Sequence, residues 1–128
     1  MRINNEDLLE VDGTRTTPSM ATSFNLKPIY LGHICNYSIQ LVFTGTPGGN
    51  FKLQMSNDPG RIDAASEAEQ EASISNWTDI ADSAQTISAA GDHAWQVENA
   101  GYRWVRVVWT QTSSTGTLTI ARANVKGS

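Results

Sequence analysis

Short runs in which apolar and polar residues alternate are the feature that most constrains the fold of this chain. In residues 36–44 every second side chain is apolar, namely Tyr37, Ile39, Leu41 and Phe43. Alternate residues of a β-strand point to opposite faces, so this spacing predicts a strand with one buried face. Residues 51–56 repeat the spacing after a turn at residues 45–50. We therefore expect the two runs to pair as a hairpin.

Residues 102–110 have the strongest β character in the chain. One face of a strand here carries Arg103, Val105, Val107 and Trp109, and the other carries Tyr102, Trp104, Arg106 and Val108. Both faces are largely apolar, which is typical of a strand in the middle of a sheet or at a contact between subunits. An arginine in such a segment has a carboxylate or backbone partner, or lies at an interface. We predict Tyr102, Trp104 and Arg106 as interface residues.

Turn residues divide the rest of the chain into further short strands. Strand-like runs are expected at residues 21–26, 29–34, 77–80, 84–88, 94–97 and 117–125. Residues 64–71 are instead rich in Ala and Glu, and we expect about two helical turns there, within an exposed excursion. Short strands broken by turns at this density, with no long helix, predict an all-β fold: an antiparallel β-sandwich of jelly-roll type.

The first residues differ from the rest of the chain. We expect residues 1–19 to form an extended N-terminal arm and residues 20–128 to form the single sandwich domain, since 128 residues suffice for one core and not for two. The arm mixes polar residues with the apolar side chains of Leu8, Leu9 and Val11. Apolar side chains are more stable out of water, so we predict that these three dock on a neighbouring chain.

Charge and cysteine content argue against several classes of protein. The formal net charge is −4 and the nine Lys and Arg residues are scattered, which leaves little to attract phosphates, so nucleic acid is not an expected partner. Cys35 is the only cysteine, which rules out an intrachain disulfide or a thiolate zinc cluster. Neither a signal segment nor an apolar stretch of membrane-spanning length is recognisable. We therefore expect no membrane partner and synthesis in a host cytoplasm.

Catalytic patterns are weak throughout. His33 and Cys35 would share one side of a strand, as in half a metal site, but no further ligands stand nearby, and we expect packing or surface roles for them and for His93. The three glutamates within residues 67–71 are more typical of a solvated surface than of a catalytic acid pair. Phosphate loops, nucleophile elbows and calcium loops are not recognisable. The sequence predicts no enzyme activity, no cofactor and no metal.

The tryptophans allow two interpretations. There are four, at positions 77, 95, 104 and 109. They are able to form an aromatic platform for a sugar, or to fill the space between two sheets. In a domain this small the second role is favoured, because large aromatic side chains supply much of the buried area.

Several motifs between residues 51 and 127 carry a resemblance to a known family. They are FKLQMSND at 51–58, NWTDI at 76–80, GYRWVRV at 101–107, GTLT at 116–119 and NVKG at 124–127. With these motifs the chain resembles small structural proteins encoded beside the major capsid protein in tailed bacteriophages. The resemblance implies a jelly-roll cement or decoration protein on the capsid surface of the virion, bridging subunits of the major capsid protein and often associating with itself as a dimer or trimer. Such bridging stabilises a shell through buried area and multivalent contact.

A second resemblance remains open beside the first. Residues 56–58, 77–78 and 102–106 are also similar to discoidin-type sandwich domains, which bind sugars or membranes through loop tips. This resemblance implies a carbohydrate-binding module of a phage tail or fibre, or of a secreted protein. Those domains usually have a disulfide joining their ends and are exported, whereas this chain has one cysteine and no recognisable signal segment.

Overall fold

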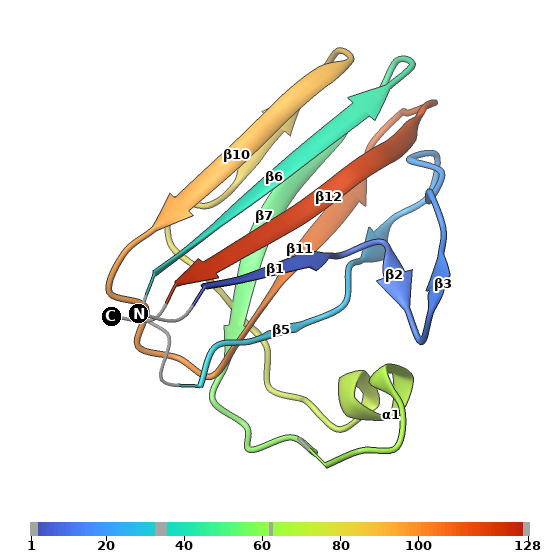
Figure 1. Ribbon diagram of the computed structural model, residues 1–128. Helices are drawn as coiled ribbons and strands as arrows, with labels where there is room; N and C mark the ends of the chain where they lie inside the picture. Colours follow the sequence, from blue (N-terminus) through green and yellow to red (C-terminus); the bar gives the residue numbers. More distant parts are fainter. Residues whose placement is uncertain (1–2, 33–35, 62, 127–128) are drawn as a thin grey trace.

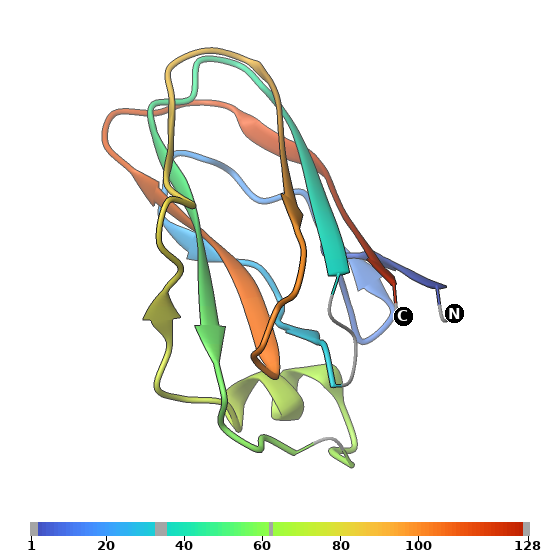
Figure 2. The same cartoon turned by 90° about the vertical axis from the view of Figure 1, so that its left-hand side faces the viewer.

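A computed structural model describes residues 3–32, 36–61 and 63–126, and it consists almost entirely of β-strands (Figure 1). The elements are β1 (Ile3–Asp7), β2 (Glu10–Val11), β3 (Thr14–Arg15), β4 (Phe24–Asn25), β5 (Ile29–Tyr30), β6 (Asn36–Thr44), β7 (Gly49–Ser56), α1 (Glu67–Ala72), β8 (Thr78–Asp79), β9 (Gln85–Ile87), β10 (Gly91–Val97), β11 (Trp104–Gln111) and β12 (Thr117–Lys126). Seen from the side, the strands form two layers, with α1 at one end (Figure 2).

The strands are arranged in two antiparallel sheets and one small hairpin. The first sheet has the order β1-β12-β6-β10. In the second, β11 and β7 are central, β4 and β5 pair with β11, and β8 and β9 pair with β7. The pairings are nested along the chain: β1 with β12, β4 and β5 with β11, β6 with β10, and β7 with β8 and β9. Such a nested arrangement closed into two sheets is a jelly roll, so the predicted fold class is confirmed.

The hairpin expected between the strands that became β6 and β7 is not formed. β6 pairs with β10 and β12, whereas β7 pairs with β8, β9 and β11 in the opposite sheet. The turn between them therefore crosses from one sheet to the other. Phe43 of β6 and Phe51 of β7 meet across the interior, with their ring centroids 5.7 Å apart. Alternation identified the buried face of each strand correctly, but it carries no information about which strand is the hydrogen-bonding partner.

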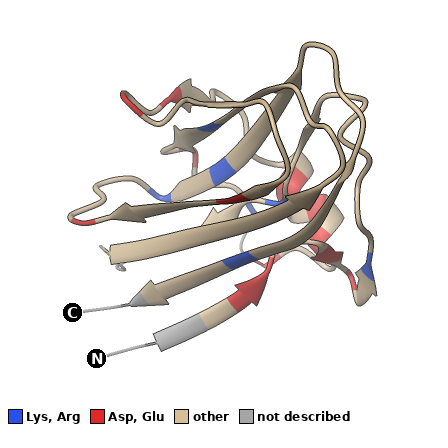
Figure 3. Ribbon diagram, turned by 90° about the horizontal axis from the view of Figure 1, so that it is seen from above, with Lys and Arg blue, Asp and Glu red and all other residues tan. Residues whose placement is uncertain are grey.

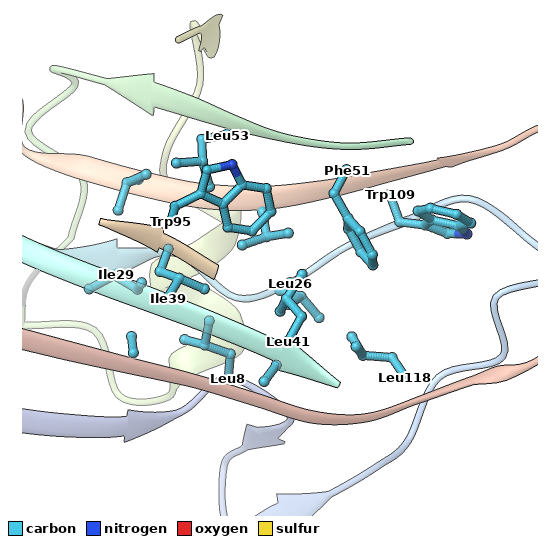
Figure 4. Close-up of a cluster of buried hydrophobic side chains, with 14 of the residues drawn as sticks. Leu8, Leu26, Ile29, Ile39, Leu41, Phe51, Leu53, Trp95, Trp109 and Leu118 are labelled. Atoms are coloured by element: carbon cyan, nitrogen blue, oxygen red, sulfur yellow. The ribbon is translucent and has the colours of Figure 1, made fainter. Parts of the chain in front are cut away.

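The core lies between the two sheets and is dominated by large side chains (Figure 4). Phe51 and Trp109 pack with ring centroids 4.6 Å apart. The indole N–H groups inside the core are satisfied, since that of Trp109 donates to the Met20 carbonyl at 3.0 Å and that of Trp95 donates to the Ser83 carbonyl at 2.9 Å. Burial of each large side chain stabilises the fold by about 1.5–3 kcal/mol.

The N-terminal segment is part of the sandwich and not a separate arm. β1 is extended, as expected, but it pairs along β12, with Asn5 opposite Asn124, and so forms one edge of the four-stranded sheet. Leu8 and Leu9 are only 1% and 3% exposed. Figure 4 shows Leu8 among the other core side chains. The prediction that Leu8 and Leu9 dock on a neighbouring chain is thus corrected, because their own chain already buries them, and no boundary at residue 19 separates an arm from the domain.

An excursion at residues 57–76 leaves the six-stranded sheet and contains α1. The Ser66 hydroxyl caps this helix by accepting the Glu69 N–H at 3.1 Å, from the extended conformation that suits an N-cap. Asp58 links the two ends of the excursion, because its carboxylate accepts hydrogen bonds from the hydroxyl and the N–H of Ser75 at 2.7 and 2.8 Å. These hydrogen bonds lower the pKa of Asp58. The short helix predicted in this region is present, displaced toward the C-terminal side.

Candidate functional site

The outer face of the six-stranded sheet is partly covered by its own chain. Trp104 points to this face and is fully buried there. The Tyr30 ring packs on the Trp104 ring at a centroid distance of 4.8 Å. The indole N–H of Trp104 donates to the Asp58 carbonyl at 3.0 Å. The excursion approaches so closely that a Cβ at Gly60 would lie 2.9 Å from the Trp104 ring. Trp104 is therefore held beneath the excursion, and in this position it offers no surface to a partner.

Arg106 lies on the same outer face and also finds its partners within the chain. Its Nε and one terminal nitrogen donate to Gln54 Oε1 at 2.9 and 2.7 Å. Its guanidinium carbon stands 4.3 Å from the centre of the Trp77 ring, within the range of a cation–π interaction. Burial lowers the pKa of Arg106, and the nearby Glu71 carboxylate raises it. The partners of this arginine are an amide and an aromatic ring, which the sequence pattern did not indicate.

The remaining predicted interface residues lie elsewhere. The hydroxyl of Tyr102 is 2.6 Å from that of Tyr37, and burial raises the pKa of both. Val11 is half-buried on β2, beside a pocket of about 140 Å³ that lies between this hairpin, β4 and α1. The residues predicted for an interface are thus distributed over the core, the N-terminal hairpin and β11, and the structure does not bring them together on one surface.

In contrast, the outer face of the four-stranded sheet is uncovered by the described part of the chain. The strand register places its side chains in three rows. The rows are Gln96–Ser38–Asn124–Asn5, Ala94–Gln40–Arg122–Asp7 and Asp92–Val42–Ile120. The first two rows are polar apart from Ala94 and mostly uncharged, whereas the third contains the half-buried apolar side chains of Val42 and Ile120. Figure 3 shows the few charged segments of this sheet, which include a basic segment on β12 and the acidic end of β1.

Two shallow hollows adjoin on this bare face. The larger has a volume of about 570 Å³ and lies over β1, β6 and β12, and the smaller, of about 190 Å³, lies over the ends of β6, β10 and β12. Ser38 and Asn124 line both hollows. The Asn124 Oδ1 atom is buried and has no hydrogen-bond partner among the described residues. A buried acceptor without a partner is unusual, so this atom is suited to receive a donor from a bound molecule.

The charged groups of β1 and β12 on the bare face lie close to groups of opposite charge. Asp7 Oδ2 accepts from Arg15 Nε at 3.0 Å, and Arg122 lies opposite Asp7 on the neighbouring strand. Burial raises the pKa of Asp7, but the hydrogen bonds from the Leu9 N–H and from Arg15, together with the charges of Arg15 and Arg122, lower it overall. The face therefore presents mainly neutral donors and acceptors to its surroundings.

Residues weighed for metal binding or catalysis form no cluster in the described regions. The proposed pairing of His33 with Cys35 falls outside the described residues. His93 is half-buried on β10, where its ring lies 4.6 Å from that of Trp95 and burial lowers its pKa. Residues 3–32, 36–61 and 63–126 contain no group of three or more His, Cys, Asp or Glu arranged to hold a metal ion. Within the same residues, no helix has the length and apolar character that crossing a membrane requires.

Most of the tryptophans belong to the interior. Trp95 and Trp109 are buried between the sheets, as the core interpretation predicts, whereas Trp104 is buried on the outer face of the six-stranded sheet, beneath the excursion. Trp77 is half-buried, and the guanidinium of Arg106 lies over its ring. A sugar platform made of several exposed tryptophans is therefore not present in this structure.

These features define the class of the protein as a small jelly-roll β-sandwich with one bare, polar sheet face. Neither a protein-family model nor a curated protein sequence matches the chain. Solved structures do match it, over nearly its whole length.

Three of these structures have TM-scores of 0.50 or slightly above. The SPBc2 prophage-derived protein YomS is 9% identical, with a TM-score of 0.50 over 97% of this chain and 92% of that protein. The CBM36-1 domain of a multidomain xylanase from the hindgut metagenome of Trinervitermes trinervoides is 6% identical, with a TM-score of 0.51 over 99% and 98% of the chains. A protein of the disulfide-linked pili of Bacillus endospore appendages is 10% identical, with a TM-score of 0.50 over 98% and 88%. At such low identity the similarity shows a shared fold.

Proposed function

We propose that this protein is a non-enzymatic structural component of a tailed-phage particle, which binds the major capsid protein and decorates the head. In this proposal the bare outer face of the four-stranded sheet lies on the capsid. The single observation that carries it is the contrast between the two sheets. One outer face is partly covered by the excursion at residues 57–76, and the other is left open by the described residues, with two adjoining hollows and a buried acceptor that has no partner among those residues.

Two further observations support the assignment to a phage particle. The motifs in residues 51–127 resemble structural proteins encoded beside phage capsid proteins. The prophage-derived protein YomS has the same fold over nearly the whole chain. A rigid sandwich whose polar face is uncovered is suited to hydrogen-bonded docking on a protein shell, where many copies bind at once and the total stabilisation grows with their number.

Binding to capsid shells tests this proposal. Purified protein is mixed with expanded, DNA-free shells of the phage whose genome encodes it, and bound protein is measured after sedimentation. We expect saturation at a fixed number of copies per shell. Gln40→Lys, in the middle of the bare face, buries an unpaired charge in the contact at about 2 kcal/mol or more, so its apparent Kd should be at least about tenfold higher.

Thr110→Lys is the matched control, because Thr110 is exposed on β11 in the other sheet. It adds the same charge at a strand position away from the proposed contact, and it should bind like the wild type. Absence of saturable binding, or equal weakening by both substitutions, would contradict the proposal.

Glycan binding at the same hollows is the second candidate function. Ser38, Asn124 and Gln96 offer the hydroxyl and amide groups that recognise sugar hydroxyls, and the CBM36-1 domain of a xylanase shares the fold. A glycan array distinguishes the two candidates. Glycan signals that disappear in Asn124→Ala but persist in Thr110→Lys, together with no binding to shells, would favour this second function.

A further inference from the structure

One edge of the four-stranded sheet carries a row of backbone groups without partners in the described residues. β10 pairs with β6 on one side and with no described strand on the other. The direction of its backbone N–H and C=O groups follows from their alternation between the two sides of an antiparallel strand. The Leu8 N–H donates to the Ala121 carbonyl, so Ala121 faces β1, and its neighbour Arg122 faces β6 and bonds with Gln40. Backbone groups alternate along an antiparallel strand, and therefore Leu41 and the other odd residues of β6 face β10.

The same alternation continues into β10. His93 and Trp95 lie opposite Leu41 and Ile39, so their backbone groups face β6. The N–H and C=O groups of Asp92, Ala94 and Gln96 must then point away from the sheet. None of these groups has a backbone or side-chain partner among the described residues. This row is a template for another strand.

The other sheet edges of the described structure have features that disfavour pairing with a further strand, and the edge of β10 has none of them. β1 places the charged Glu6 on the interior side, opposite the buried Ala123, and an inward-pointing charge is a known protection of an edge. The outer strands of the second sheet, β4, β5, β8 and β9, are two or three residues long. β10 has seven residues, none of them Pro, Lys or Arg, and a regular register with β6. Its one charged residue, Asp92, lies near its start.

We propose that two copies of this chain associate through their β10 strands, paired antiparallel about a two-fold axis at Ala94. In this register the outward backbone groups of Asp92 meet those of Gln96 from the second copy, and those of Ala94 meet their own counterparts. Every outward N–H and C=O of these three residues gains a partner. Only the small Ala94 side chain lies at the axis, so the register produces no crowding there.

Neighbouring registers are less favourable. Outward backbone groups belong to even-numbered residues, so the axis must pass through a residue, and His93 and Trp95 are the nearest alternatives to Ala94. With the axis at Trp95, Asp92 lies opposite Glu98, and like charges directly opposite one another are destabilising. With the axis at His93, Gln96 lies opposite Ala90, which is outside the strand. The register centred on Ala94 is the one that uses the whole of β10.

Such a dimer would join two bare faces into one continuous sheet surface. Both copies would then present their polar rows side by side, and a contact made by one copy would raise the effective concentration of the other at a nearby site. The dimer itself does not depend on the proposed capsid role, since it would form in solution with no shell present.

Sedimentation equilibrium over a range of protein concentrations tests the proposal. We expect wild-type protein to sediment with twice the mass of the chain, in a reversible equilibrium with the monomer. Ala94→Lys places two like charges at the axis and should sediment as a monomer at concentrations where the wild type is dimeric. Thr110→Lys adds the same charge on the other sheet, away from the axis, and should remain dimeric.

A second variant separates loss of pairing from loss of fold. Ala94→Pro removes an N–H that points outward, and proline is tolerated where the N–H of an edge strand faces solvent, so the variant should fold and remain monomeric. In the wild type, the amides of Asp92, Ala94 and Gln96 should exchange with deuterium more slowly as protein concentration rises. A wild type that stays monomeric, a trimer, or an Ala94→Lys variant that dimerises like the wild type would each overturn the proposal. A monomeric wild type that still saturates shells would leave the capsid proposal intact.

Discussion

Asp12 and Glu67, which are 55 residues apart in the sequence, cap each other's backbone. Asp12 Oδ1 accepts the Glu67 N–H at 2.6 Å, and Glu67 Oε1 accepts the Asp12 N–H at 3.2 Å. The other Glu67 oxygen receives Lys27 Nζ at 2.7 Å. This is the reciprocal arrangement of a capping box, made here between two distant segments. It ties the β2–β3 turn to the first turn of α1.

Removing this tether should loosen the helix without unfolding the sandwich. We expect Asp12→Ala to lower the free energy of unfolding by about 1 kcal/mol, as for the loss of an N-cap, and to speed amide exchange at Glu67 and Ala68. Urea unfolding and hydrogen exchange measure the two effects. Asp12→Asn keeps an acceptor and should lose less. Equal losses in the two variants would show that the hydrogen bonds to Asp12 are not the cause.

The side chain of Glu6 should make stability depend on pH. Its Oε2 atom is buried with no hydrogen-bond partner among the described residues. Burial raises its pKa, the charge of Lys27 lowers it and that of Glu67 raises it, with a net increase. The folded state therefore holds this proton more tightly than the unfolded chain does, so the stabilising effect of protonation is present at low pH and is lost as pH rises through the folded-state pKa.

We expect Glu6→Gln to melt at a higher temperature than the wild type at pH 7, because the buried charge is gone. The advantage should shrink as pH falls through the raised pKa of the wild-type carboxyl, because that carboxyl is then protonated. Thermal melts at a series of pH values provide the measurement. Glu10→Gln, at an exposed position, is the control. A constant difference between Glu6→Gln and the wild type at all pH values would contradict this explanation.

Gly116 lies in the turn before β12, in close contact with the backbone of Thr44 and Gly45, and no side chain fits there. Its φ is +120°, and a Cβ there would collide with the carbonyl oxygen of Thr44. Both the backbone conformation and the contact disfavour any other residue, so we expect Gly116→Ala to destabilise the fold by about 1–3 kcal/mol. At Gly101 a Cβ would meet nothing within 4 Å, and Gly101→Ala should change stability by less than about 0.5 kcal/mol. Chemical denaturation compares them, and similar values for the two would refute the argument.

The pair formed by Arg106 and Trp77 should be measurable as a coupling energy. We expect a double-mutant cycle with Arg106→Ala and Trp77→Ala to give about 0.5–1 kcal/mol, since the guanidinium stands over a half-buried ring. Arg106→Lys should lose most of this coupling energy, because an ammonium lacks the planar group that stacks on the Trp77 ring and that two hydrogen bonds to Gln54 hold in place. Unfolding experiments on the single and double variants supply the values. Additive effects would mean that the contact contributes nothing to stability.

Strand positions and faces were largely predictable from the sequence, because alternation is a local property. The buried face of β6 and the central place of β11 both follow from the residues that those strands contain. The pairing of β6 was not predictable in the same way. A turn at residues 45–50 suits a hairpin and a crossing between sheets equally well, and the outcome depends on strands far away in the sequence.

The candidate site was harder to anticipate than the fold. Trp104 and Arg106 were singled out because they lie in an apolar strand. The partners of these residues come from separate parts of the chain: the excursion covers Trp104, and Gln54 and Trp77 contact Arg106. The polar rows of the bare face had only a weak signal in the sequence. Ser38, Gln40 and the other polar residues of these strands looked like an ordinary solvated side.

By itself, the sequence determined that this chain forms short, half-buried strands with a jelly-roll type of core, because side-chain direction along a strand depends only on residue order. Only the tertiary structure decided that Leu8 and Leu9 are buried in their own chain, that the excursion covers Trp104 and that the edge of β10 is unpaired among the described strands. Each of these depends on which segments meet in space. Burial and hydrogen bonding between distant segments are settled only when the two sheets close on one another. Among the described residues, that closure leaves the outer face of the four-stranded sheet and the edge of β10 uncovered.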